Sequence, residues 1–141
     1  MTIFIPAWNK GALEPIEKLE VHKRGLKHKA ISIFVFYGEK LLIQQRASNK
    51  YHSPELWANT CCSHPNWGES SDDCSRRRIF EELGLKNLEL RFIDQIEYKA
   101  NVGSGLIEHE IVDCFSAFCE KKPEVKMNPE EVKDFAWIDI E

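Results

Sequence analysis

Hydrophobic side chains fall in short runs separated by turn-forming residues along most of the chain, a pattern that predicts strands. Residues 31–36 are rich in β-branched and aromatic side chains, residues 41–45 begin with three aliphatic ones, and Gly38 lies between them. This arrangement predicts a β-hairpin. Further strands are predicted at residues 59–62, 88–98, 107–118 and 135–140. The polar segment 46–58 is expected to be a long loop, and long loops in compact domains tend to carry function.

One segment instead carries the signals of a helix. Ser70 and the three residues after it offer hydroxyls for an N-cap and carboxylates for the positive end of the helix dipole. A partial hydrophobic stripe follows, made of Cys74, Ile79, Phe80 and Leu83. Because Gly84 suits the position just past a last turn, the pattern predicts a helix over residues 70–83. Strands around one central helix indicate an α+β class, a mixed α/β sandwich, in a single domain over residues 1–141.

Composition excludes several classes of protein. The chain has 141 residues, 43% hydrophobic and 30% charged, which is enough apolar surface for one folded domain. The net charge of −4 disfavours nucleic acid as a partner. The longest apolar run, residues 30–37, is far shorter than the roughly 20 residues of a membrane span, so no membrane partner is expected. Five cysteines, without a CxxC pair or a secretory signal, indicate the cytoplasm.

Two glutamates stand out in the predicted strand 107–118. Because side chains alternate along a strand, Glu108 and Glu110 share one face, roughly 7 Å apart, and Val112 and Cys114 continue that face. Carboxylates beside apolar residues need a partner, and a metal ion is one solution. Taken alone, the two glutamates are explained slightly better by a solvated sheet edge.

Three histidines offer further ligands. His22 and His28 flank a turn-prone segment, and His64 follows the paired cysteines. Each alone is better explained as a surface or core residue. Three imidazoles with two carboxylates would nevertheless form a five-ligand site suited to Mn²⁺, Zn²⁺ or Mg²⁺. The remaining histidines, His52 and His109, are expected at the surface.

Residues 63–85 combine acidic, basic, aliphatic and small residues at a defined spacing: Glu69, Arg77, Ile79, Glu81, Glu82, Gly84 and Leu85. These positions resemble the Nudix box, a pattern used for diphosphate chemistry. Two positions depart: Ser63 replaces the opening glycine, and Arg78 replaces a glutamate. Positions 78 and 82 share a helix face, where the pattern normally places carboxylates that bind Mg²⁺. Because its guanidinium is a fixed cation, Arg78 can bind a diphosphate there but cannot bind Mg²⁺. The resemblance implies a Nudix fold with its helix near residues 70–83, and it weakens the expectation of a hydrolase.

Residues 59–65 have the sequence Asn-Thr-Cys-Cys-Ser-His-Pro. This segment is similar to the catalytic-cysteine signature of the type I isopentenyl-diphosphate isomerases of the Nudix superfamily. A longer stretch, from about residue 18 to 137, strongly resembles the same family. Supporting matches occur at residues 42–46, Lys50, Trp57 and residues 108–110. The resemblance implies a metal-binding isomerase that interconverts isopentenyl and dimethylallyl diphosphate in isoprenoid biosynthesis, with a small isoprenoid diphosphate as its partner.

The same resemblance implies roles for particular side chains. Cys62 and Glu110 would be opposing acid/base groups, with Tyr98 beside Glu110. One divalent ion would be held by His22, His28, His64, Glu108 and Glu110. A second ion, a Mg²⁺ that arrives with the diphosphate, would be held by Glu82. The diphosphate oxygens would be bound by Lys18, Arg46, Lys50 and Arg78. The other four cysteines are expected to be packing residues.

Such residues suit the reaction. Moving an unactivated double bond requires one proton to be added and another removed, through a tertiary carbocation, so two proton-handling groups on opposite faces fit the task. Family members usually continue past the strand containing Trp137 with a helical segment that carries a pocket indole. This chain ends at Glu141, so that segment is expected to be lacking and Trp137 to be a core residue. Two alternatives stay open: a Nudix diphosphate hydrolase, and a non-enzymatic module that binds a metal or a protein.

Overall fold

The computed structural model describes residues 2–50 and 53–140. Its elements follow in the order β1 (Phe4–Asn9), β2 (Ala12–Glu17), α1 (Lys18–Arg24), β3 (Lys27–Tyr37), β4 (Lys40–Arg46), β5 (Trp57–Ala58), β6 (Cys61–Ser63), α2 (Ser71–Leu83), β7 (Arg91–Gly103), β8 (Leu106–Cys119) and β9 (Val132–Asp139). The described strands form one mixed sheet. Neither helix in this part of the chain combines the length and the apolar character needed to cross a bilayer.

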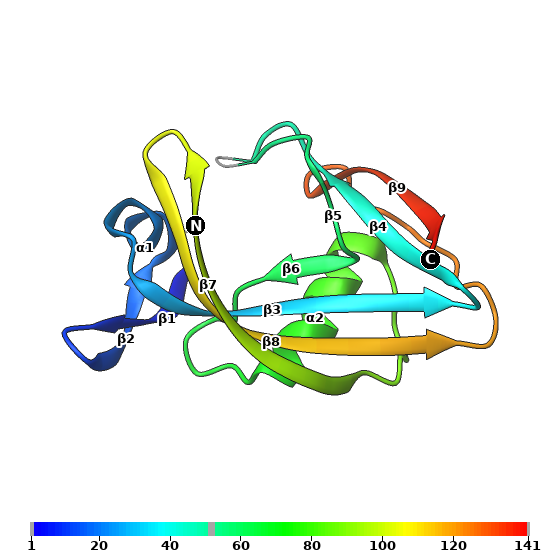
Figure 1. Ribbon diagram of the computed structural model, residues 1–141, viewed down its shortest axis with the longest axis horizontal. Helices are drawn as coiled ribbons and strands as arrows, with labels where there is room; N and C mark the ends of the chain where they lie inside the picture. Colours follow the sequence, from blue (N-terminus) through cyan, green and yellow to red (C-terminus); the bar gives the residue numbers. More distant parts are fainter. Residues whose placement is uncertain (1, 51–52, 141) are drawn as a thin grey trace.

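Strand β3 is the centre of the sheet. It pairs antiparallel with β1, β4 and β6 and parallel with β8, while β7 and β9 extend the sheet from β8 and β4. In Figure 1, β3 and β8 run side by side, with the β1–β2 hairpin and α1 at one end and β4 and β9 toward the other. Alternation along β3 buries Ile31, Ile33 and Val35 in the main core and turns Ser32 and Phe34 to the opposite face.

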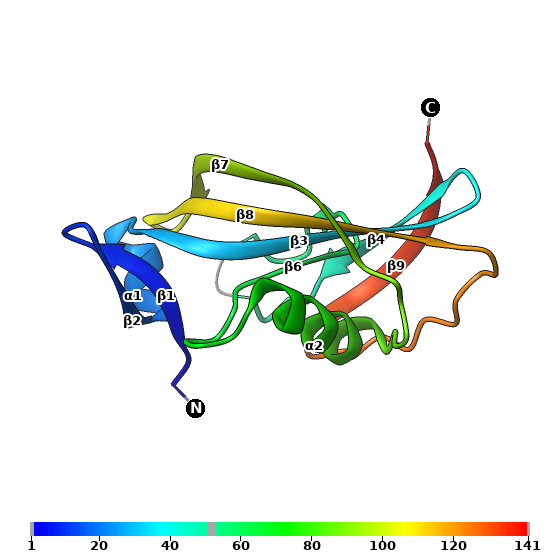
Figure 2. The ribbon, with the colours of Figure 1, turned by 90° about the horizontal axis from the view of Figure 1, so that it is seen from below.

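Helix α2 covers one face of the sheet, as Figure 2 shows. It begins after Ser70, whose hydroxyl accepts a hydrogen bond of 3.1 Å from the Asp73 N–H, and it ends at Gly84, which has a φ of +68°. The predicted helix and the α+β class are therefore confirmed. The core between α2 and the sheet is made of Ile31, Ile33, Val35, Leu42, Cys61, Cys74, Ile79, Leu83, Leu85, Phe115, Ala117 and Val132.

The N-terminal elements are not predicted by the sequence pattern. Pro6 and Pro15 lie opposite each other in the β1–β2 hairpin, and proline normally counts against a strand because it lacks an N–H. Lys10 and Gly11 close this hairpin with positive φ angles. Helix α1 has only seven residues and ends at Gly25, so it is too short to show a hydrophobic stripe.

Some strand boundaries also differ from the prediction. The predicted loop 46–58 contains the end of β4 and the short strand β5, and strand β6 starts later than residue 59. Side chains replace ladder bonds just before β6: the Asn59 amide donates to the Ile33 carbonyl (2.8 Å), and the Thr60 hydroxyl donates to the Leu42 carbonyl (2.6 Å). These bonds hold the segment without the regular pairing that the sequence pattern suggests.

Candidate active site and metal centre

A cavity of about 660 Å³ opens among strands β3, β4, β6, β7 and β8, the carboxyl half of α2 and the segment after β4. Most of the side chains that the sequence singles out lie on its wall. These are Lys18, Arg46, Lys50, Cys62, His64, Arg78, Glu82, Tyr98, Glu108 and Glu110. These residues come from six elements and two connecting segments, and they converge on one space large enough for a small molecule.

Three imidazoles meet beside this cavity. His22 lies on α1, His28 near the start of β3, and His64 directly after β6. Their ring centroids are 4.9 Å (His22–His28), 5.4 Å (His22–His64) and 4.9 Å (His28–His64) apart. Glu110 joins them, so that one ligand atom from each of the four residues lies within 4.8 Å of the others. Imidazole nitrogens with a carboxylate oxygen form a donor set typical of divalent transition metals.

Backbone carbonyls orient two of these rings. The Nδ1 atoms of His22 and His28 lie 2.8 Å from the carbonyl oxygens of Lys18 and Leu26. Because a carbonyl oxygen only accepts, each Nδ1 carries a hydrogen, and Nε2 is the ring atom left to face a metal ion. Burial lowers the pKa of His22 and of His64 below the usual value, which keeps both rings neutral at pH 7. Neutral, oriented imidazoles fit a divalent ion.

Strand register places Glu110 between two partners. It lies opposite His28 in the parallel β3–β8 pair and opposite Tyr98 in the antiparallel β7–β8 pair. His28 Nε2 is 3.3 Å from one carboxylate oxygen of Glu110, and the Tyr98 hydroxyl donates to the other at 2.6 Å. The same hydroxyl lies 2.9 Å from Glu108, and burial together with the charge of Glu110 raises the pKa of Glu108. Glu108 stands outside the group of four converging ligands, although it lines the cavity.

The Cys62 thiol is held by polar side chains of neighbouring segments. Its Sγ donates to Asn59 Oδ1 at 3.0 Å and lies 3.6 Å from the Ser32 hydroxyl. The amide of Asn59 is fixed, because its Nδ2 donates to Ser32 and to the Ile33 carbonyl. The sulfur is open to the cavity yet deeply surrounded by protein, and this desolvation raises its pKa to about 12. Cys61 points to the opposite face and is fully buried, as expected.

An apolar strip separates the thiol from the carboxylate. The register puts Cys62 beside Ser32 of β3, and Glu110 beside His28, four positions or about 13 Å away along the strand. The row between them consists of Ala30, Val112 and Ile96. One cavity therefore presents a thiol and a carboxylate at the two ends of an apolar strip.

Cations gather at another part of the cavity wall. Lys18, Arg46, Lys50 and Arg78 come from the start of α1, the end of β4, the segment after it and α2. Burial, together with the charges of Lys50 and Arg78, lowers the pKa of Lys18 to about 8. Cations close enough to suppress the ionisation of one another form a site that favours an anion.

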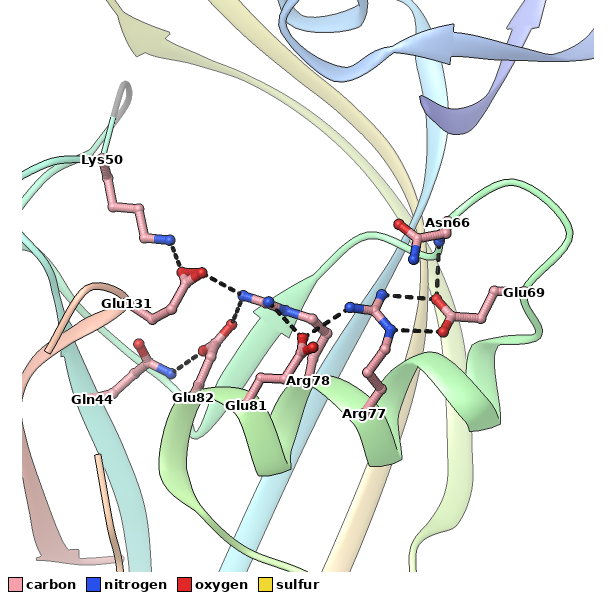
Figure 3. A network of polar contacts seen from close by, with 9 residues as sticks. All are labelled: Gln44, Lys50, Asn66, Glu69, Arg77, Arg78, Glu81, Glu82 and Glu131. Carbon is pink, nitrogen blue, oxygen red and sulfur yellow. Dashed lines mark hydrogen bonds and ion pairs between the residues drawn. The ribbon is translucent and has the colours of Figure 1, made fainter. Parts of the chain in front are cut away.

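A network of polar contacts organises these cations, and Figure 3 shows it. The Arg78 guanidinium lies 2.7 Å from Glu82 and 3.2 Å from Glu131. Gln44 donates to the second oxygen of Glu82 at 2.7 Å, and Lys50 forms an ion pair with Glu131. Glu82, the predicted ligand of the second ion, thus carries a hydrogen bond on each oxygen.

A second ion pair of α2 supports the loop before the helix. Arg77 donates two hydrogen bonds to Glu69, at 2.7 and 2.9 Å, and Glu69 also accepts from the Asn66 N–H at 3.0 Å (Figure 3). Both Glu69 and Arg77 are matched positions of the Nudix pattern. Their geometry explains that spacing, since the guanidinium reaches back from the helix to the loop that leads into it.

Sequence reasoning missed the supporting residues of the site. Ser32 and Asn59 hold the thiol, and Glu131 joins two cations. Asn59 stands in the cysteine signature without an assigned role, and Ser32 and Glu131 belong to no local pattern with a chemical meaning. Cys114, expected only to pack, also lines the cavity. His109 pairs with Glu97 on the other face of β8, at 2.8 Å, and stays apart from the imidazole cluster. The expected surface residue His52 lies outside the described residues.

Comparison with known proteins places this site in a family. The NUDIX domain pattern matches residues 26–141. Isopentenyl-diphosphate Delta-isomerase of Cereibacter sphaeroides (strain ATCC 17025) is 57% identical over 140 residues, covering 99% of this chain and 79% of the relative. The chain belongs to the Nudix-type isopentenyl-diphosphate Delta-isomerases. A relative of the same name from Jannaschia sp. (strain CCS1) is 56% identical, with 99% and 80% covered.

Solved structures agree on the Nudix fold. The MutT protein from Methanosarcina mazei Go1 superposes with a TM-score of 0.67 at 16% identity, covering 80% of this chain and 77% of that one. DR0079 from Deinococcus radiodurans gives a TM-score of 0.71 at 14% identity, with 96% and 83% covered. At such low identity these structures confirm the fold of the chain and say nothing about its reaction, which has to be argued from its own side chains.

Proposed function

We propose that this chain interconverts isopentenyl diphosphate and dimethylallyl diphosphate. The observation that carries the proposal is the content of one cavity: the Cys62 thiol and the Glu110 carboxylate at the two ends of an apolar strip, with four cations on the same wall. The name of the close relatives supports the same reaction. The Arg78–Glu82 pair disfavours the hydrolase alternative, because a cation occupies a position where a hydrolase holds Mg²⁺.

The proton balance of the reaction assigns a task to each proposed acid/base group. One carbon of the double bond gains a proton, which leaves a tertiary cation, and a second carbon then loses a proton, which restores a double bond. Cys62 and Glu110 are proposed to give and take these two protons. The hydrogen bond from the Tyr98 hydroxyl orients the Glu110 carboxylate for the proposed proton transfer. The apolar row between them suits the hydrocarbon tail.

The cation cluster is proposed to hold the diphosphate end. Lys18, Arg46, Lys50 and Arg78 present ammonium and guanidinium donors to one side of the cavity. Guanidinium groups bind phosphate oxygens with two parallel hydrogen bonds, and ammonium groups bind them as compact charges. Anchoring the charged end fixes the position of the reacting carbons relative to Cys62 and Glu110.

Two divalent ions are proposed cofactors. His22, His28, His64 and Glu110, with Glu108 beside them, would hold one ion, whether Mn²⁺, Zn²⁺ or Mg²⁺. Such an ion supplies a fixed positive charge that makes a nearby carboxyl group a stronger acid. Glu82 would hold the Mg²⁺ that accompanies the diphosphate. The five free thiols suit the cytoplasm, the compartment that we propose for the protein.

The decisive experiment follows hydrogen exchange. The protein is incubated with isopentenyl diphosphate and Mg²⁺ in heavy water, and NMR is used to follow the substrate, the product and inorganic phosphate. We expect dimethylallyl diphosphate to appear with deuterium in both isomers and without release of phosphate. The substitutions Cys62→Ala and Glu110→Gln are each expected to abolish deuterium uptake.

A matched cysteine variant separates the role of the thiol from a general loss of fold. Cys119→Ala removes a thiol that is absent from the cavity wall, and it should retain the wild-type rate of uptake. Full activity of Cys62→Ala would refute the assigned role of that sulfur. Release of phosphate without deuterium uptake would establish the hydrolase instead.

A further inference from the structure

Glu131 occupies a position between two cations of the cavity. Its side chain accepts a hydrogen bond from Lys50 and lies 3.2 Å from the Arg78 guanidinium, so one carboxylate links the segment after β4 to helix α2 (Figure 3). Only 22% of the Glu131 side chain is exposed, and that of Arg78 is 17% exposed. Ion pairs this sheltered are screened less by solvent than surface pairs are.

The backbone around Glu131 is docked on the end of α2. The Lys126 and Asn128 N–H groups donate to the carbonyls of Leu83 and Glu82, at 2.9 Å each. The Glu131 carbonyl then accepts from the Ala47 N–H at 3.2 Å, so the same residue also holds the start of the segment that carries Lys50. The position of the Glu131 carboxylate is therefore set by bonds on both sides of the cavity.

A carboxylate at this place has two opposing effects on an anion. Its negative charge repels a diphosphate, but it also holds Lys50 and Arg78 in place and offsets the repulsion between them. A lysine side chain loses considerable rotamer freedom when it binds, and Glu131 has already restricted that freedom. Lys50 has three hydrogen-bond donors and Arg78 has five, so both keep donors for phosphate oxygens while they contact Glu131. The second effect is therefore expected to outweigh the first.

We propose that Glu131 is a positioning residue for the diphosphate end of the substrate. It acts through Lys50 and Arg78 and increases the affinity for a diphosphate without taking part in proton transfer. This inference rests on the proposed function for its account of the substrate. Its binding test is independent of turnover, because inorganic pyrophosphate presents the same anionic group without the hydrocarbon tail.

The test measures pyrophosphate binding by isothermal titration calorimetry in the presence of Mg²⁺. Glu131→Gln keeps the shape of the side chain and removes its charge. We expect the Kd for pyrophosphate to rise about tenfold, the size expected for losing charge-assisted hydrogen bonds. The KM for isopentenyl diphosphate should rise by the same factor, while kcat stays within about twofold. The change Glu124→Gln removes the same charge from an exposed residue of the same segment that is absent from the cavity wall, and its Kd should equal that of the wild type.

A double-mutant cycle separates positioning from a general structural role. In a Lys50→Gln background, Glu131→Gln should weaken pyrophosphate binding only about twofold, since the partner that it positions is gone. Equal effects in both backgrounds, an unchanged Kd, or tighter binding by Glu131→Gln would each overturn the proposal. If Glu131→Gln fails to give a cooperative melting transition, Glu131→Asp replaces it, because it keeps the charge but withdraws the carboxylate from the two cations. If the wild type does not isomerise isopentenyl diphosphate but the pyrophosphate measurements come out as expected, the proposed substrate is wrong and the positioning role of Glu131 stands.

Discussion

The hydroxyl of Tyr98 lies 2.6 Å from Glu110 and 2.9 Å from Glu108, so one phenol bridges two carboxylates on the adjacent strand. Like charges this close need a hydrogen-bond donor or a cation between them. Burial and the two carboxylates raise the pKa of Tyr98 above its usual value, which keeps the phenol a hydrogen-bond donor at pH 7. Tyr98 thus fixes the orientation of the proposed acid/base carboxylate.

Removing this hydroxyl should reduce the rate. Tyr98→Phe leaves the ring in place but releases both carboxylates, and we expect kcat to fall about 10- to 100-fold, as is typical when a group that orients an active-site carboxylate is lost. Initial rates of dimethylallyl diphosphate formation provide the measurement. Tyr37→Phe is the control, since Tyr37 packs against Trp137 far along β3 from His28, and its kcat should not change.

The imidazole cluster predicts a metal-dependent gain in stability. A ligand that binds only the folded state raises the melting temperature, so Mn²⁺ or Zn²⁺ should raise the Tm of the metal-free protein and bind with one ion per chain at this site. His28→Ala removes a fully buried ligand, and it should abolish most of the increase in Tm. His109→Ala should keep it, because His109 lies on the other face of β8. An equal increase in both variants would contradict the assigned ligands.

Gly84 should tolerate no side chain. It has a φ of +68°, and an added Cβ would lie 2.8 Å from the Lys126 Cβ and 2.9 Å from the Lys126 carbonyl oxygen. We expect Gly84→Ala to lower the free energy of unfolding by about 3 kcal/mol, through backbone strain and overlap together. Gly38→Ala shares the positive φ but meets nothing within 4 Å, so it should cost about 1 kcal/mol. Chemical denaturation of both variants measures the difference.

The Glu69–Arg77 pair predicts a pH-dependent contribution to stability. The hydrogen bonds from Arg77 hold the pKa of Glu69 below its usual value, so the folded state releases this proton more readily than the unfolded state does. The contribution is therefore complete above the unfolded pKa of about 4.3, and it disappears as the pH falls through the lower folded value. Glu69→Gln should lower the free energy of unfolding by about 1 kcal/mol at pH 7 and by nothing near pH 3.

A surface pair is the control for this prediction. Glu89 and Arg91 also form an ion pair, at 3.1 Å, but both side chains are more than 70% exposed. Glu89→Gln should leave the free energy of unfolding almost unchanged at both pH values. Denaturant unfolding at pH 7 and pH 3 gives the comparison, and a pH-independent loss for Glu69→Gln would contradict the assigned pair.

Local signals explain which parts of the fold the sequence predicts. Ser70 and Gly84 predict the helix over residues 70–83, because their capping roles depend only on neighbours in the chain. The β1–β2 hairpin is not predicted, because Pro6 and Pro15 argue against strands. It is stabilised by contacts distant in sequence, which are the pairing of β1 with β3 and the packing of Ile5 and Ala7 against Val21 of α1.

The site depends on contacts that no local pattern contains. His28 and Glu110 are 82 positions apart, and only the parallel pairing of β3 with β8 brings them together. The resemblance to a family supplied their grouping, whereas the spacing of the histidines did not. Glu131 has no such signal, because its partners come from the docking of its segment on the end of α2.

Strands β3 and β8 pair without interruption from Lys27 opposite His109 to Tyr37 opposite Cys119. A single insertion or deletion within either strand would shift the register on one side of it, and the side chains on that side would turn to the wrong face. Related genes should therefore align without gaps along both strands, and length variation should collect at the hairpin tips around Gly38 and Gly105. A fluorescent label or an affinity peptide built in at either tip should therefore leave the pairing of His28 with Glu110 intact.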